Sequence, residues 1–186
     1  MKTEHKVIDD FLPQKEFQEI QAIFMETSPI HNENIGWVYT SAVAEMNESE
    51  NWKYFYMNHM MCFNSLITSP FFDYILPVLN KLDIKSLIRI KANLFPNSEK
   101  IYEHEMHVDY SWTHKAAILY INTCNGYTKL ANGTKIDSVA NRVLLFDPGI
   151  EHCSTTTTNV FARINININY IQVESFSYNE MKGRNV

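Results

Sequence analysis

The pattern of apolar and polar positions divides the chain into a helical first part and a strand-rich second part. Apolar residues recur at helical spacing over residues 11–25, where Pro13 stands near the start of the expected helix. A second helix is predicted over residues 70–82, and Pro77 is expected to kink or divide it. A short strand is expected at residues 7–8, before the first helix.

From residue 86 onward, short strand-like runs alternate with turn signals that contain Gly, Asn or Pro. Helices followed by many short antiparallel strands are typical of a mainly β, α+β fold, here a β-sandwich or jelly roll supported by N-terminal helices. We expect a single domain over residues 1–186, with an N-terminal buttress at 1–85 and a β core at 86–172. The predicted strands are SLIRIKANLF (86–95), EHEMHVDYSW (103–112), KAAILYIN (115–122), RVLLF (142–146) and FARINININYI (161–171).

The most regular alternation in the chain lies in the last of these runs. Ile164, Ile166 and Ile168 share one face, which belongs against apolar packing. Arg163 shares the opposite face with Asn165, Asn167 and Asn169. A polar face of this kind normally meets water. If it lines the interior of a barrel instead, it needs a polar ligand, because a buried unpaired guanidinium is very costly in free energy.

Charge and composition exclude several classes of protein. The chain has 16 Lys and Arg against 21 Asp and Glu, a net charge of −5, and so lacks the basic balance that non-specific nucleic-acid binding needs. No apolar run reaches membrane-span length and the N-terminus has no signal-peptide core, so we expect a cytosolic protein. The three cysteines have no CxxC spacing, which argues against a disulfide framework or a Cys-rich zinc site. A monomer and a homodimer are both open.

Three residues far apart in the sequence have the side chains of a metal site. His107 and Asp109 are two positions apart in a predicted strand, so their side chains would share a face. His152 follows an apolar strand and the turn 147–149, which would bring it to the same end of the sandwich. Two histidines and one carboxylate form a facial triad that leaves coordination positions open and suits non-haem Fe(II). His114, the other histidine that follows Asp109 in the sequence, is expected in a turn.

Arg163 lies eleven residues after His152. A short turn and a return strand would bring it deeper into the same cavity. Its planar guanidinium suits the bidentate binding of a carboxylate, such as the far end of a dicarboxylate whose other end binds the metal. A simpler alternative is an ion pair between Arg163 and an acid such as Glu103 or Glu105.

Together, His107-x-Asp109, His152 and Arg163 resemble the signature of the Fe(II)- and 2-oxoglutarate-dependent dioxygenases. Within that superfamily the chain resembles the prolyl-hydroxylase-like branch, and especially its short single-domain members from bacteriophages. The resemblance covers residues 88–170, and the opening segment VIDDFLP with its following helix is also similar. It implies a double-stranded β-helix with the metal near its open end.

The resemblance also implies a cofactor set and a reaction. His107, Asp109 and His152 would bind Fe(II), and 2-oxoglutarate would bind the metal at one end. Its far carboxylate would meet Arg163 and the hydroxyl of Tyr120, which matches a cosubstrate-binding tyrosine of related hydroxylases. With O2 as the other cosubstrate, and ascorbate as an expected stimulant, the reaction would release succinate and CO2 and hydroxylate a C–H bond.

One position departs from the family pattern. Phe95 stands where many members have a second tyrosine that binds the cosubstrate, so a hydroxyl group is missing. Asn93, two residues earlier on the same face, is the candidate replacement. Asn165 stands two residues after the arginine, where some branches of the family have a serine, and is a further candidate contact to the cosubstrate. Tyr110 and Trp112 follow the metal-ligand motif and are expected at the rim of the pocket.

The substrate is predicted less sharply than the cosubstrate. A peptidyl or amino-acid-like substrate is favoured by the resemblance, and residues 51–64, rich in aromatic residues and methionines, would form an edge strand or a cover over the pocket. The first alternative is a non-enzymatic jelly-roll module with a binding or structural role. The second is a cupin-like metalloenzyme without a cosubstrate, which Arg163 argues against. The third is a nucleic-acid demethylase of the same superfamily, which the acidic balance disfavours.

Overall fold

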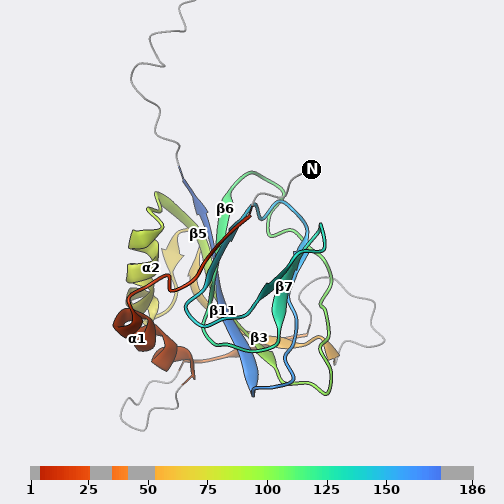
Figure 1. Ribbon diagram of the computed structural model, residues 1–186. Coiled ribbons are helices and arrows are strands. Elements are labelled where there is room, and N and C mark those ends of the chain that lie inside the picture. The colour runs from red at the N-terminus through yellow and green to blue at the C-terminus, as the bar shows by residue number, and fades with distance from the viewer. Residues whose placement is uncertain (1–4, 26–34, 42–52, 173–186) are drawn as a thin grey trace, which may run out of the picture.

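The computed structural model describes residues 5–25, 35–41 and 53–172, and these form two antiparallel sheets with helices on one side (Figure 1). The large sheet has the order β1-β9-β6-β11-β5-β3-β2 with β4 beside β3, and the small sheet has the order β10-β7-β8. The large sheet contains β1 (His5–Ile8), β2 (Val38–Thr40), β3 (Tyr56–Phe63), β4 (Leu66–Ile67), β5 (Ser86–Pro96), β6 (Lys115–Tyr120), β9 (Val143–Phe146) and β11 (Ala162–Ile171). The small sheet contains β7 (Tyr127–Leu130), β8 (Lys135–Asp137) and β10 (His152–Cys153).

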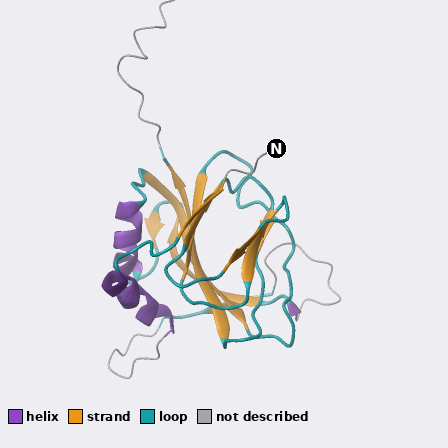
Figure 2. Cartoon of the chain, in the orientation of Figure 1, coloured by secondary structure: helices purple, strands orange, loops and turns teal. Residues whose placement is uncertain are grey.

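The helices cover the outer face of the large sheet (Figure 2). Helix α1 (Gln14–Met25) begins directly after Pro13, as predicted, and buries Phe17, Ile20 and Phe24. The second predicted helix is divided into a 3-10 helix, η2 (Phe72–Ile75), and α2 (Leu76–Lys81). Pro77 lies in the first turn of α2, where its missing N–H costs nothing, so the predicted division at this proline is confirmed.

Strand β11 lies at the centre of the large sheet between β5 and β6, and its two faces have opposite characters. Ile164, Ile166 and Ile168 pack in the apolar core beneath the helices. The opposite face is also buried, although it consists of Arg163 and three asparagines. This polar face therefore lines the interior between the two sheets, next to a smaller apolar cluster formed around Tyr120 and Phe146.

The segment predicted as a strand at 103–112 is irregular. It forms two isolated bridges, His107 with His152 of the small sheet and Glu103 with Thr155 just beyond that sheet. Because β10 has only two residues, it offers no continuous edge for a ladder, and the strand prediction is wrong here. The short strands β7, β8 and β10 were not predicted.

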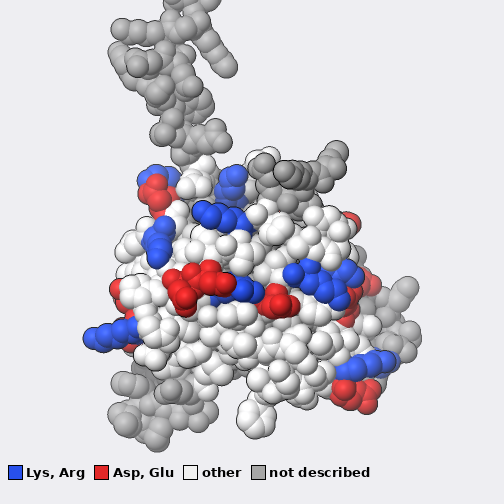
Figure 3. Space-filling model, in the orientation of Figure 1, with Lys and Arg blue, Asp and Glu red and all other residues white. Residues whose placement is uncertain are grey.

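The segment 51–64 contributes β3, which pairs with β5 on one side and with β2 and β4 on the other. It is therefore an inner strand over most of its length, and residues 51–52 lie outside the described part of the chain. No helix within the described ranges is long and apolar enough to cross a membrane. The three cysteines are buried and free. On the face drawn in Figure 3, acidic and basic side chains are interspersed and so produce no field of a single sign there.

Candidate metal centre

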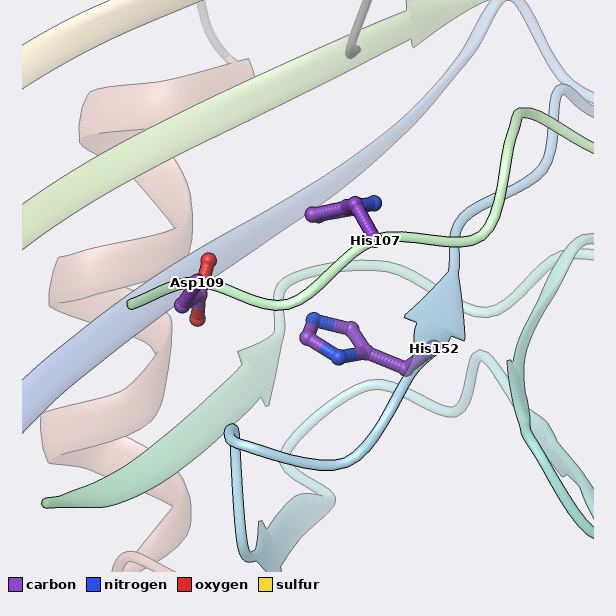
Figure 4. Close-up of side chains that lie close together, drawn as sticks. All are labelled: His107, Asp109 and His152. Carbon is purple, nitrogen blue, oxygen red and sulfur yellow. The ribbon is translucent and has the colours of Figure 1, made fainter. Parts of the chain in front are cut away.

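The structure brings His107, Asp109 and His152 together at one end of the space between the sheets (Figure 4). One ligand atom from each residue lies within 4.8 Å of the other two. The main chains of His107 and His152 exchange two N–H···O hydrogen bonds of 3.0 and 2.9 Å, which set the two rings side by side with centroids 4.7 Å apart. The amide of Asp109 donates to the carbonyl of Pro148 at 3.1 Å, which fixes the carboxylate beside them.

Both imidazoles are oriented by a backbone carbonyl. His107 Nδ1 lies 3.2 Å from the carbonyl oxygen of Glu105, and His152 Nδ1 lies 3.0 Å from that of Ile150. A carbonyl oxygen only accepts, so each Nδ1 has the hydrogen and each Nε2 keeps a free lone pair. Burial, and then the neighbouring His152 ring, lower the pKa of His107. That imidazole is therefore neutral near pH 7 and available to a cation.

Asp109 is held by three side-chain donors. Arg89 Nη2 donates to Oδ1 at 2.7 Å, while the amides of Asn167 and Asn169 donate to Oδ2 at 3.1 and 2.8 Å. Burial alone would raise the pKa of Asp109, but Arg89, His152 and the two amides outweigh it and hold the pKa far below its ordinary value. A carboxylate has roughly four lone-pair positions, so one remains for a further partner.

This donor set fits a divalent transition metal. Two imidazoles and one ionised carboxylate supply three ligands from one side, which is the arrangement that Fe(II) oxygenases use. Within the described ranges, these three residues form the group of metal-binding side chains whose ligand atoms lie close enough together to hold one ion. His114 is not part of it: its Nδ1 lies 2.8 Å from the carbonyl of Trp112, and the ring is buried behind the site.

A cavity opens from the three ligand side chains into the interior. Lys91, Asn93 and Phe95 of β5 line it, together with Asn165 and Asn167 of β11. These side chains share the cavity because β5 and β11 are paired in a register that sets Asn165 opposite Asn93 and Asn167 opposite Lys91. The candidate residues Asn93 and Asn165 bind each other, with Asn93 Nδ2 donating to Asn165 Oδ1 at 3.0 Å.

Arg163 is fully buried behind the far wall of this cavity. Its Nη1 donates to Ser154 Oγ at 2.6 Å and its Nη2 donates to Thr128 Oγ1 at 3.0 Å, while Nε has no partner. The hydroxyl of Tyr120 also donates to Thr128 Oγ1, at 2.9 Å. Ser154 and Thr128 line the cavity, so Arg163 and Tyr120 face it through these two hydroxyls.

No carboxylate in the described part of the chain lies at ion-pair distance from Arg163. Glu103 and Glu105, the acids considered as its partner, are not paired with it, and Glu103 is bound instead by Lys129 at 2.6 Å and by the hydroxyl of Tyr127. Among the described residues, the guanidinium therefore has two hydroxyl partners and the carbonyl of Thr155 at 3.4 Å but no counter-ion, which is a costly state for a buried cation.

The remaining predicted residues lie around this core. Phe95 stacks on Tyr56 with ring centroids 5.5 Å apart, and the Arg163 guanidinium lies 5.3 Å from the Phe95 ring centre. Phe95 is thus an apolar wall, and Tyr56 brings a hydroxyl to the same wall from β3. Tyr110 and Trp112 pack on each other, with centroids 5.4 Å apart, and neither lines the cavity.

Sequence analysis missed four residues of the site, namely Arg89, Lys91, Thr128 and Ser154, and it placed Asn167 and Asn169 on the polar face with Arg163 without a role. A signal was present for those on β5, since Arg89, Lys91 and Asn93 alternate with Ile88, Ile90 and Ala92 in the same way as the polar face of β11 does. Thr128 and Ser154 had no such signal, because β7 was not predicted and Ser154 follows a strand of two residues.

Gly126 packs against the side chain of Arg163, at a position where a larger residue would collide with it. A Cβ at this position would lie 2.6 Å from Arg163 Cδ and 2.6 Å from the carbonyl oxygen of Thr156. Since backbone cannot move aside cheaply, Gly126→Ala is expected to lower the free energy of unfolding by about 1–3 kcal/mol. Urea unfolding measures this, with Gly36→Ala as the control, because a Cβ at Gly36 meets nothing within 4 Å. Equal stability of both variants would contradict this account of Gly126.

No family model matches the chain, and no curated protein matches it. Solved structures do match. A 2OG-Fe(II) oxygenase family oxidoreductase from Burkholderia pseudomallei has a TM-score of 0.65 at 11% identity, covering 90% of this chain and 84% of that one. A prolyl hydroxylase from Trichoplax adhaerens, in complex with a hypoxia inducible factor peptide fragment, has a TM-score of 0.61 at 15% identity over 91% and 84%.

A viral collagen prolyl hydroxylase from Paramecium Bursaria Chlorella virus-1, in a 2OG complex, has a TM-score of 0.52 at 14% identity, covering 91% of this chain and 98% of that one. At such identities the likeness is one of fold. The resemblance predicted from the sequence is therefore confirmed at that level: the chain has the jelly-roll fold of the 2OG-Fe(II) oxygenases and prolyl hydroxylases.

Proposed function

We propose that this protein is an Fe(II)- and 2-oxoglutarate-dependent dioxygenase that hydroxylates a C–H bond of a peptidyl or amino-acid-like substrate and releases succinate and CO2. One observation supports this most directly: a buried guanidinium without a counter-ion lies behind the cavity that three metal-binding side chains share. A cation at the far end and a metal at the near end suit a dicarboxylate. The fold shared with the 2OG-Fe(II) oxygenases supports the same reaction class.

His107, Asp109 and His152 would hold the metal. When bound together with 2-oxoglutarate, Fe(II) supplies the activation of O2 that a C–H bond needs. The chain's own residues prepare the ligands. Arg89 and the amides of Asn167 and Asn169 keep Asp109 ionised and fixed in orientation, and the two backbone carbonyls fix the tautomers of the histidines.

The far carboxylate of the cosubstrate would be bound through hydroxyl groups. Ser154 Oγ and Thr128 Oγ1 accept hydrogen bonds from Arg163, so each hydroxyl hydrogen is free to donate into the cavity. Tyr120 also donates to Thr128 Oγ1, so this oxygen accepts two hydrogen bonds and its own hydrogen stays available to the carboxylate. The charge of Arg163 would thus act on the carboxylate from behind two donors, without water between them. No protein general base is required for this chemistry, and we propose none.

The test is a binding measurement followed by an activity measurement. Calorimetry with Mn(II), which does not turn over, is expected to give one metal site, and 2-oxoglutarate is expected to bind only after the metal. With Fe(II), ascorbate and O2, succinate is expected to form slowly even without the substrate. A folded protein that takes up neither ligand would favour the alternative function, a non-enzymatic jelly-roll module.

A further inference from the structure

The cavity contains a second cation that the proposed chemistry does not use. Lys91 lines it from β5, on the side of the three metal-ligating side chains. Its ammonium donates to the hydroxyl of Tyr56, 3.3 Å from Nζ, and lies 5.4 Å from the centre of the same ring. Within the described ranges, no carboxylate lies at ion-pair distance from Lys91.

The surroundings of Lys91 do not compensate its charge. Asp109 is the acid among the lining residues, and it is already bound by Arg89 at 2.7 Å. Burial, and then repulsion by Arg89, lower the pKa of Lys91 to about 8, although Asp109 acts in the opposite direction. The ammonium form still predominates at pH 7 and lacks a close anion.

The same imbalance remains after the proposed ligands are added. Lys91 lines the cavity, Arg89 binds its lining residue Asp109, and Arg163 lies behind Ser154 and Thr128, so three positive charges stand against the one negative charge of Asp109. A divalent metal and the dianion 2-oxoglutarate cancel each other. A positive surplus therefore stays in a half-enclosed space, and a neutral substrate would leave it uncompensated.

A buried amide oxygen next to Lys91 also lacks a hydrogen-bond partner among the described residues. Asn167 stands opposite Lys91 in the register of β5 and β11, and its Nδ2 is used by Asp109. Its Oδ1 is buried and accepts no hydrogen bond from any residue that the structure describes. The side chain lines the cavity, so this oxygen suits an N–H or O–H group of a bound molecule.

We infer that the substrate has a carboxylate that pairs with Lys91 and, next to it, an N–H or O–H group that donates to Asn167. This inference rests on the proposed function and narrows its substrate class. The head group of a free α-amino acid satisfies both residues at once, since its carboxylate and ammonium share one carbon. An acidic side chain within a peptide offers the same chemistry, with a backbone N–H as the donor. The cosubstrate does not fill this role, because the metal and the Ser154–Thr128 wall use its two carboxylates.

The test compares acids with their amides on the protein loaded with Mn(II) and 2-oxoglutarate. Calorimetry is run with the common L-amino acids, each beside its carboxamide, and with the N-acetyl amides of aspartate, glutamate, asparagine and glutamine. At least one acid is expected to bind about tenfold or more tightly than its amide, the size of one charged hydrogen bond. Binding by free amino acids identifies the first source of the carboxylate, and binding by the N-acetyl amides of the acids identifies the second.

Lys91→Met is expected to remove the preference for acids, and Lys91→Arg to retain part of it, while both leave the Kd of 2-oxoglutarate unchanged. Lys115→Met is the control, since Lys115 is exposed at the start of β6. A wild-type protein without any preference for acids overturns the inference. So does a loss of 2-oxoglutarate affinity in Lys91→Met, which would assign Lys91 to the cosubstrate.

Failure of the proposed function is visible separately, because uptake of Mn(II) and 2-oxoglutarate is measured before the substrate panel. If the wild-type protein binds neither, the panel is repeated on the protein alone. A preference for acids that Lys91→Met removes then supports a carboxylate site without an oxygenase, and its absence overturns both proposals.

Discussion

Replacing His152 by alanine is expected to abolish succinate formation and to weaken metal binding by more than about 100-fold, since altering a mere supporting partner of a metal ligand already costs 10- to 100-fold. The fold is expected to survive, because the bridge between residues 152 and 107 is made by main-chain atoms that alanine keeps. Calorimetry with Mn(II) and a succinate assay with Fe(II) measure the two effects.

The matched control for this variant is His59→Ala. Both ring nitrogens of His59 are bound elsewhere, to the carbonyl of Gly36 and the hydroxyl of Ser69, so its loss removes an imidazole without touching the cavity. This control is expected to retain wild-type metal affinity. Unchanged metal binding in His152→Ala would exclude this histidine as a ligand.

Replacing Arg163 by methionine is expected to weaken 2-oxoglutarate binding by about 30-fold, because the two hydroxyl donors lose the charge behind them and one hydrogen bond to a charged group is worth about 1.5–3 kcal/mol. Metal binding is expected to persist, since Arg163 makes no contact with the ligand side chains. The free energy of unfolding without ligands is expected not to fall, because the variant no longer buries a cation that lacks a counter-ion.

Loss of the cosubstrate without loss of stability separates a binding role from a structural one. Arg163→Lys keeps the charge but not the planar guanidinium. Its affinity for 2-oxoglutarate is therefore expected to lie between those of the wild type and Arg163→Met. Calorimetry with Mn(II)-loaded protein gives the affinity, and urea unfolding gives the stability. Wild-type 2-oxoglutarate affinity in Arg163→Met would remove this residue from the proposed pocket.

Local periodicity was enough to predict the elements whose packing is decided by one face. Helix α1 and the division at Pro77 followed from apolar spacing and from proline chemistry. Strand β11 followed from strict alternation, and its isoleucine face is in the core as expected. In contrast, the strands of the small sheet have two to four residues, too few for any period to be visible.

Part of the candidate site was also predictable from local sequence patterns. His107, Asp109 and His152 were recognised from residue type and spacing, and the structure brings them together although residues 103–112 form no strand. Lys91 and Arg89 were missed because their approach to Asp109 depends on how β5 is aligned with β11, and this alignment is not encoded in either strand alone.

That alignment has a consequence for folding. The stretch Asn165–Asn169 repeats every two residues, so sliding β11 by two positions against its neighbours would return asparagine to asparagine and isoleucine to isoleucine. Apolar packing therefore discriminates poorly between the native alignment and a shifted one. The alignments differ in contacts that only the native one makes. In it, Arg163 donates to Ser154, and the amides of Asn167 and Asn169 donate to the carboxylate of Asp109. The groups assigned to chemistry would thus also decide which of several nearly equivalent chain arrangements the protein adopts.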